Sequence, residues 1–170
     1  FAAFATAGEQ LRGNQEIRVV VLSGEGKAFC AGLDVANFAG AAPGSAPDSI
    51  PKALSERTNG IANLPQYAAW MWRELPVPVI TAMHGVAFGG GFQVALGADI
   101  RIAAPGTRMS VMEIKWGLVP DMAGTQLMRH LARDDVVREL TYTGRIFDAE
   151  EALAMGFVTR IANDPYRSAP

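Results

Sequence analysis

Three consecutive glycines, Gly89 to Gly91, stand between an apolar run and a helical pattern, where their backbone N–H groups can face an anion. The first N–H groups of a helix have no partner within it, and the helix dipole favours negative charge at that end. A tight packing turn between a strand and a helix is the alternative interpretation. The glycines do not fit a dinucleotide fingerprint, because Val94 stands where a further glycine is required, and no Gly-Lys-Ser/Thr follows.

Two acidic residues, Glu113 and Asp121, stand eight positions apart. Glu113 has the apolar neighbours Met112, Ile114 and Trp116, and burial in apolar surroundings raises the pKa of a carboxyl toward a catalytically useful range. Considered alone, Glu113 is also typical of a surface or capping residue. Asp121 has a similar alternative, because Pro-Asp-x-x-Gly before an apolar pattern suits the N-cap of a helix.

Gln93 lies three residues after Gly90, so a helix that begins at the glycines would place both residues on one face. An amide neither gives nor takes a proton near neutral pH, although it can orient a water molecule or a ligand. Gln93 is therefore a candidate orienting residue and not a second acid or base. A polar side chain that hydrogen-bonds across a helix start is the alternative.

The elements that must position these residues alternate between strand and helix patterns. Short apolar runs bounded by turn residues predict strands at 17–22, 77–83, 99–103, 109–112 and 157–161. Helical spacing predicts helices at 1–11, 92–96, 124–132, 136–141 and 149–155, with two more within 50–75 that are separated at Pro65. This order indicates an α/β fold with a largely parallel sheet. We expect Tyr67, Trp70 and Trp72 in the core or in the wall of an acyl pocket.

The composition indicates one domain, because 170 residues of which 49% are hydrophobic can bury a single core. A formal net charge of −2 without a clustered basic face favours neither nucleic acid nor an anionic membrane as a partner. The most apolar stretch, 76–104, contains Asp99 and Arg101 and is not expected to cross a bilayer. One cysteine, Cys30, and two histidines provide neither an internal disulfide nor a zinc cluster, so we expect no metal and a cytoplasmic protein.

Several motifs occur in an order and spacing that resemble the crotonase, or enoyl-CoA hydratase/isomerase, superfamily. They are Lys27-Ala28-Phe29-Cys30-Ala31-Gly32-Leu33-Asp34, His84 to Leu96, Met112-Glu113, Gly117 to Asp121, Tyr142 to Arg145 and Ala152 to Val158. The resemblance implies a single crotonase-like domain over residues 1–170. Its core, at 17–161, would be a superhelix of ββα units with a largely parallel sheet, and the usual C-terminal helical region is expected to be missing.

By this resemblance, the backbone N–H groups of Leu33 and Gly90 form the oxyanion hole of an acyl-CoA enzyme. Formation of a thioester enolate moves negative charge onto the carbonyl oxygen, and each preorganised donor stabilises that charge by roughly several kcal/mol. A capping role is the alternative for Asp34. Contacts with the substrate or its CoA are implied for six residues, namely Ala28, Ala31, Gly32, Asp34, Gly89 and Gln93.

The catalytic carboxylates distinguish the members of the superfamily. Its hydratases carry Glu where this chain has Gln93, whereas its dienoyl-CoA isomerases have a Glu/Asp pair similar to Glu113 and Asp121 but another Asp at position 93. We therefore expect double-bond isomerisation of an enoyl- or dienoyl-CoA, with Glu113 as principal base and Asp121 as second proton carrier. The alternatives are a hydratase that uses Glu113 on a water held by Gln93, and a non-catalytic acyl-CoA-binding subunit.

The resemblance also implies that CoA enters as part of the substrate, that no other cofactor is needed, and that the protein forms homotrimers or hexamers. The segment 39–51, rich in Ala, Gly, Pro and Ser, is expected to be a surface loop that can act as a lid. Because the chain begins at Phe1 with a helical pattern, we expect it to be an internal piece of a longer protein.

Overall fold

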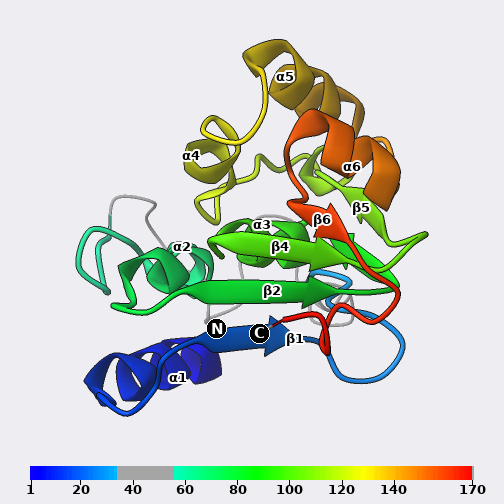
Figure 1. Cartoon of the computed structure of the whole chain (residues 1–170). Helices are drawn as coiled ribbons and strands as arrows, with labels where there is room; N and C mark the ends of the chain where they lie inside the picture. The colour runs from blue at the N-terminus through cyan, green and yellow to red at the C-terminus, as the bar shows by residue number, and fades with distance from the viewer. Residues whose placement is uncertain (34–55, 170) are drawn as a thin grey trace.

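The computed structural model describes residues 1–33 and 56–169, and its centre is a parallel sheet of four strands (Figure 1). The strands lie in the order β1 (Val20–Ser23), β2 (Val79–Met83), β4 (Ile100–Ala103) and β6 (Arg160–Ile161). Every neighbouring pair is parallel, as the alternation of strand and helix patterns predicts. The expected lid at 39–51 lies outside the described residues, and so does Asp34.

A second, smaller parallel sheet carries the chain to the candidate site. It pairs β3 (Val86–Phe88) with β5 (Arg108–Ser110). The sequence predicts a strand at 77–83 but none at β3, because three residues are too few to display an alternating pattern. β3 ends directly at Gly89, whose N–H donates a 3.0 Å hydrogen bond to the carbonyl of Ser110.

The helices lie on both sides of the sheets. In Figure 1, α1 lies beside β1 at one end of the main sheet, and α5 and α6 lie beyond β6 at the other end. The elements are α1 (Ala2–Gly13), α2 (Leu64–Trp70), η2 (Met71–Glu74), α3 (Gly90–Leu96), η3 (Glu113–Trp116), α4 (Gly124–Met128), α5 (Asp134–Thr143) and α6 (Ala149–Met155).

Two boundaries differ from the sequence-based expectation for physical reasons. Pro65 does not separate two helices, because it stands in the first turn of α2, where a missing N–H costs nothing, and Asn63 forms a capping box with Gln66. Of the predicted strand at 157–161, only β6 is a strand. Phe157 and Val158 are buried in the core without pairing to a neighbouring strand, and their burial explains the apolar pattern.

The core is centred on α3, which is buried from Gly91 to Leu96. Phe92 of this helix contacts Phe147 and Phe157 edge to face, with ring centroids 5.6 and 5.5 Å apart, a favourable geometry for aromatic rings. Tyr67 and Trp72 are each 3% exposed and belong to a neighbouring cluster. α3 is thereby fixed on all sides, so the backbone groups at its first turn have a defined position.

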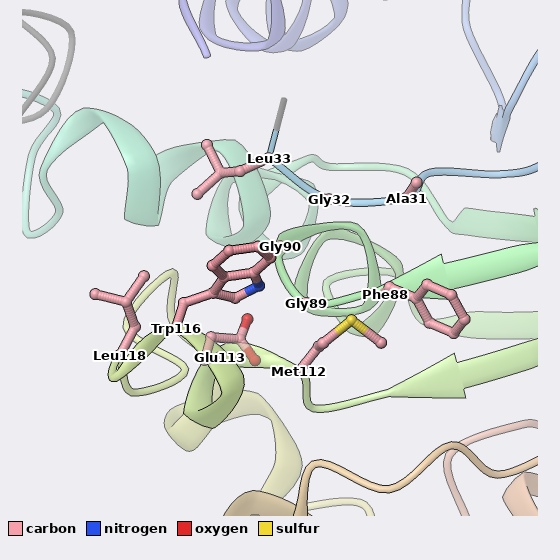
Figure 2. A pocket seen from close by; sticks show the side chains of 10 residues that line it. All are labelled: Ala31, Gly32, Leu33, Phe88, Gly89, Gly90, Met112, Glu113, Trp116 and Leu118. Atoms are coloured by element: carbon pink, nitrogen blue, oxygen red, sulfur yellow. The ribbon is translucent and has the colours of Figure 1, made fainter. Parts of the chain in front are cut away.

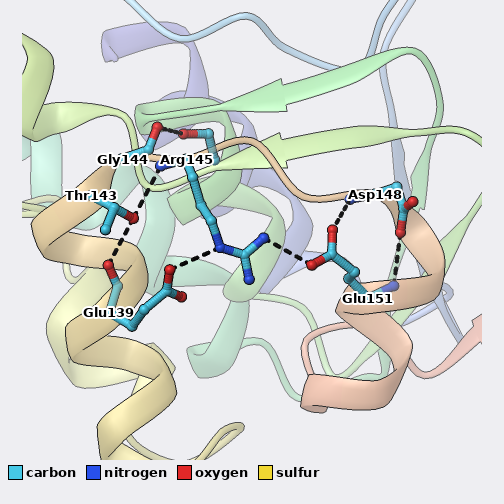
Figure 3. Close-up of polar contacts among 7 residues, drawn as sticks. Glu139, Thr143, Gly144, Arg145, Asp148 and Glu151 are labelled. Atoms are coloured by element: carbon cyan, nitrogen blue, oxygen red, sulfur yellow. Dashed lines mark hydrogen bonds and ion pairs between the residues drawn. The ribbon is translucent and has the colours of Figure 1, made fainter.

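Arg145 links the helices α5 and α6 (Figure 3). Its guanidinium donates to Glu139 on α5 at 2.9 Å and to Glu151 on α6 at 2.8 Å. The hydroxyl of Ser110 donates to the carbonyl of Gly144 in the turn between these helices, at 3.0 Å. Because Ser110 is the last residue of β5, this bond fixes the point from which the chain proceeds to η3.

None of the helices within the described ranges is both long and apolar enough to span a bilayer. Nor do three or more His, Cys, Asp or Glu side chains come together as a metal site in the part of the chain that the structure describes.

Candidate active site

A cavity of about 300 Å³ opens between the loop after β1, the first turn of α3 and the turn η3 (Figure 2). Figure 2 shows the side chains of Leu33, Trp116 and Leu118 on one side of it and those of Phe88 and Met112 on the other. The carboxyl group of Glu113 lies between them. The described residues that line the cavity are Ala31, Gly32, Leu33, Phe88, Gly89, Gly90, Met112, Glu113, Trp116 and Leu118.

Backbone hydrogen bonds hold the loop after β1 against β3. The N–H of Cys30 donates to the carbonyl of Val86 at 3.1 Å, and the N–H of Phe88 donates to the carbonyl of Cys30 at 3.0 Å. These bonds bring Gly32 beside α3, where a β-carbon on Gly32 would lie 3.8 Å from the nitrogen of Gly90. The two segments that resemblance assigns to an oxyanion hole are therefore neighbours.

Two of the three consecutive glycines are explained by local geometry. Gly89 has φ +53° and ψ −121°, a conformation that glycine adopts far more readily than other residues, and this turn directs the chain from β3 into α3. At Gly91 a β-carbon would lie 2.4 Å from the carbonyl oxygen of Cys30, so a side chain there would push the loop away. The glycines thus allow the helix start and the loop to approach closely.

The first turn of α3 stands where the sequence predicts an anion site. Gly90 is the first residue of this helix, and its N–H pairs with no acceptor within the described part of the chain. Leu33 belongs to the cavity wall as well, with a side chain that is 42% exposed. An N–H group at a helix start in a largely apolar cavity is suited to stabilise a developing oxyanion.

Glu113 is buried at the cavity wall, with 8% of its surface exposed. Its Oε1 accepts a 2.6 Å hydrogen bond from the amide of Gln93, whereas its Oε2 is buried and has no partner among the described residues. Burial raises the pKa of Glu113 above its usual value, the hydrogen bond from Gln93 opposes this, and the charge of Asp121 adds to it. A carboxyl in this state can both take and return a proton.

Asp121 lies outside the cavity wall, although its charge acts on Glu113. The residue Asp121 as a whole is exposed. Partial burial of its carboxyl group nevertheless raises the pKa of Asp121 above its usual value. The alternative capping role is also wrong, because α4 begins after Ala123 and no side chain caps it. Asp121 therefore acts on Glu113 through its charge and is not among the described residues that line the cavity.

The other predicted site residues are placed as follows. Ala31, Gly32, Leu33, Gly89 and Gly90 line the cavity together with Glu113. Gln93 is 2% exposed and stands behind Glu113. Ala28 lies farther back in the loop, where its α-carbon would be 3.0 Å from a β-carbon on Gly85.

Sequence reasoning did not identify the apolar wall of the cavity. Phe88, Met112, Trp116 and Leu118 line it, whereas the aromatic residues expected as a possible wall, Tyr67 and Trp72, are in the core. Their position in the sequence could have pointed to these four residues, because each of them stands one to five positions from a predicted site residue. Trp116 in particular is 62% exposed, which is unusual for so large an apolar side chain.

The fold is that of an α/β protein, and its cavity brings the N–H at the start of α3 together with one buried carboxyl group. Residues 2–165 match the family model described as enoyl-CoA hydratase/isomerase. The chain is 39% identical over 153 residues to carnitinyl-CoA dehydratase of Citrobacter koseri, and this match covers 89% of the chain and 54% of that relative. The protein described here therefore belongs to the enoyl-CoA hydratase/isomerase family.

Solved structures show the same fold. An enoyl-CoA hydratase from Bacillus anthracis superposes with a TM-score of 0.78 at 31% identity, over 95% of this chain and 58% of that one. An enoyl-CoA hydratase from Shewanella pealeana gives a TM-score of 0.81 at 26% identity, over 99% and 59%. The expected crotonase-like fold is thus confirmed, and the chain spans about half the length of the curated relatives it matches.

Proposed function

We propose that this chain carries the acid–base site of an enzyme that adds water to an enoyl-CoA thioester or removes it from the hydrated product. The observation that carries the proposal is Glu113, which lines the cavity together with Gly90 and whose buried Oε2 has no partner among the described residues. Among the ten described lining residues, Glu113 is the one with an ionisable side chain. This favours the alternative of a hydratase that uses Glu113 alone over the isomerase that the Glu113/Asp121 pair led us to expect.

The reaction follows from the two halves of the site. The N–H groups of Leu33 and Gly90 would bind the thioester carbonyl oxygen, and Oε2 of Glu113 would take a proton from a water molecule. The water oxygen then bonds to C3, and the π electrons of the C2–C3 bond move to the carbonyl oxygen and form the enolate. Return of the proton from Oε2 to C2 completes the hydration, and dehydration is the reverse.

The comparisons support this class of reaction. The relatives from Citrobacter koseri and Salmonella enteritidis are carnitinyl-CoA dehydratases, which are named for loss of water from an acyl-CoA. We propose that the loop from Ala28 to Asp34 contacts the CoA part of the substrate and that no other cofactor takes part. Assembly into homotrimers or hexamers and a cytoplasmic location remain expectations from the resemblance.

Double-bond isomerisation is the second candidate, because the charge of Asp121 acts on Glu113 and raises its pKa. Steady-state assays of the purified chain with crotonyl-CoA, a 3-enoyl-CoA and a 3,5-dienoyl-CoA separate the functions. Hydration of the first substrate with little turnover of the others supports the proposal. Turnover of a 3-enoyl- or dienoyl-CoA alone replaces it with isomerisation, and CoA-thioester binding without turnover identifies a non-catalytic binding subunit.

A further inference from the structure

Gln93 is held at both ends of its amide. Its Oε1 accepts a 2.8 Å hydrogen bond from the N–H of Gly124, and its Nε2 donates the 2.6 Å bond to Oε1 of Glu113. The orientation of the amide is not arbitrary, because the N–H of Gly124 can only donate and must face the oxygen. The nitrogen is thereby directed at Glu113, and the whole side chain is 2% exposed.

We propose that Gln93 is a positioning residue for Glu113, and the proposal rests on the hydratase function given above. The amide, braced by Gly124, occupies Oε1 of Glu113 and leaves Oε2 as the one oxygen that exchanges a proton with the substrate. Two observations support it: the short bond at Oε1 and the absence of any partner for Oε2 among the described residues. Gln93 does not need to touch the substrate in this role.

The choice of an amide at position 93 has an electrostatic consequence. A carboxylate in its place would put two oxygens of like charge 2.6 Å apart, and such a pair must share a proton. The amide supplies the proton of the hydrogen bond itself, so Glu113 is free to ionise. Neither α3 nor α4 carries an ionisable side chain. Lys115 of η3 and Asp121 are the charges nearest to Glu113 in the sequence, and α5, which packs against η3, adds the ionisable groups Asp134, Asp135, Arg138, Glu139 and Tyr142.

The experiment compares Gln93→Met and Gln93→Glu with the wild-type chain. Met keeps an unbranched side chain of similar length without a donor, and Glu keeps the bond from Gly124 while it places a carboxyl against Glu113. Gln126→Met is the matched control, because Gln126 is an exposed amide on α4. The carboxyl carbon of Glu113 is followed by ¹³C NMR across pH, with its signal assigned from Glu113→Gln, and kcat and KM for hydration are measured over the same range.

We expect the pKa of Glu113 to rise by about one pH unit in Gln93→Met, the size that loss of a hydrogen bond to a charged group implies. The rise should be larger in Gln93→Glu, and Gln126→Met should match the wild type. The acid limb of kcat/KM should move upward in parallel, and kcat should fall more than KM changes.

A titration of Glu113 that moves upward by less than about 0.3 pH units in both variants, or that moves downward, overturns the proposal. The NMR titration requires no turnover. If the wild-type chain does not hydrate enoyl-CoA but the pKa of Glu113 still rises in both variants, the proposed function fails and the positioning role stands. If hydration is observed but the titration does not move, only the positioning role fails.

Discussion

The backbone of Gly124 touches the side chain of Gln93 so closely that no side chain fits between them. The N–H of Gly124 donates to Oε1 of Gln93 at 2.8 Å, and a β-carbon on Gly124 would lie 2.5 Å from the same oxygen. α4 therefore acts on the candidate acid–base residue through two successive hydrogen bonds, although it does not line the cavity.

Gly124→Ala should consequently displace the amide of Gln93 from Glu113. We expect kcat for hydration to fall by a factor on the order of 10 to 100, since a misplaced acid–base group loses most of its effect. Gly13→Ala is the control, because no atom lies within 4 Å of a β-carbon built there. Full activity in a folded Gly124→Ala variant would show that the position of Gln93 does not matter.

Glu113→Gln should abolish hydration and stabilise the fold at high pH. Burial raises the pKa of Glu113 in the folded state, so its ionisation destabilises the folded chain as the pH rises through this raised pKa. Below about pH 4 the carboxyl is neutral in the folded and in the unfolded chain, and it then has no such effect. The variant should gain on the order of 1 kcal/mol at pH 8 and little near pH 4, as measured by urea unfolding at both values.

Glu150→Gln is the matched control for that experiment, since Glu150 is an exposed carboxyl on α6, away from the cavity, and its loss should leave activity intact. Retention of hydration in Glu113→Gln would remove Glu113 from the mechanism. A stability gain that is equal at pH 4 and pH 8 would contradict the buried, ionisable state described for it.

Gly90→Pro removes the N–H at the first position of α3, where proline is otherwise compatible with a helix. If this N–H stabilises the enolate oxygen, the chemical step should slow by a factor on the order of 100 to 1000. Gly90→Ala is the control, because it keeps the N–H and its β-carbon would meet only the end of the Met122 side chain, with the sulfur at 3.0 Å. Near-native single-turnover rates in a folded Gly90→Pro variant would exclude Gly90 as an oxyanion donor.

Asp121→Asn tests the role of the second carboxyl. Because the negative charge of Asp121 raises the pKa of Glu113, its removal should move the acid limb of kcat/KM to lower pH. Hydration at pH 8 should persist, whereas an isomerase that uses Asp121 as proton carrier would lose turnover of a 3,5-dienoyl-CoA. An unchanged pH profile, measured with crotonyl-CoA from pH 4 to 9, would mean that the two carboxyls do not interact.

Much of this site was accessible from the sequence because its residues are tied to local patterns. The glycines at 89–91 mark a helix start whatever the rest of the fold, whereas Glu113 and Gln93 were singled out mainly through the resemblance to the crotonase superfamily. The contact between Gln93 and Gly124 was not predictable, because these residues are 31 positions apart and meet only through the packing of α3 and α4.

The misassigned elements share a physical cause. Apolar residues at 157–158 are buried by the core, and a pattern of burial does not distinguish a paired strand from a packed loop. Proline at 65 ends a helix in the interior but is favoured in a first turn, and its role depends on the cap at Asn63. For Asp121, spacing from Glu113 did not reveal which way the chain would turn after η3.

The backbone bonds between Cys30, Val86 and Phe88 have a consequence for how this site can diverge. They fix the loop beside α3 without any side chain, whereas the apolar wall is made of side chains such as Trp116 and Leu118. Replacements in the wall can therefore alter which acyl groups fit while the candidate oxyanion donors stay in place. Selection for a new substrate would act on the wall first, and a library at positions 116 and 118 should yield folded proteins with altered acyl preference far more often than one at positions 89 to 91.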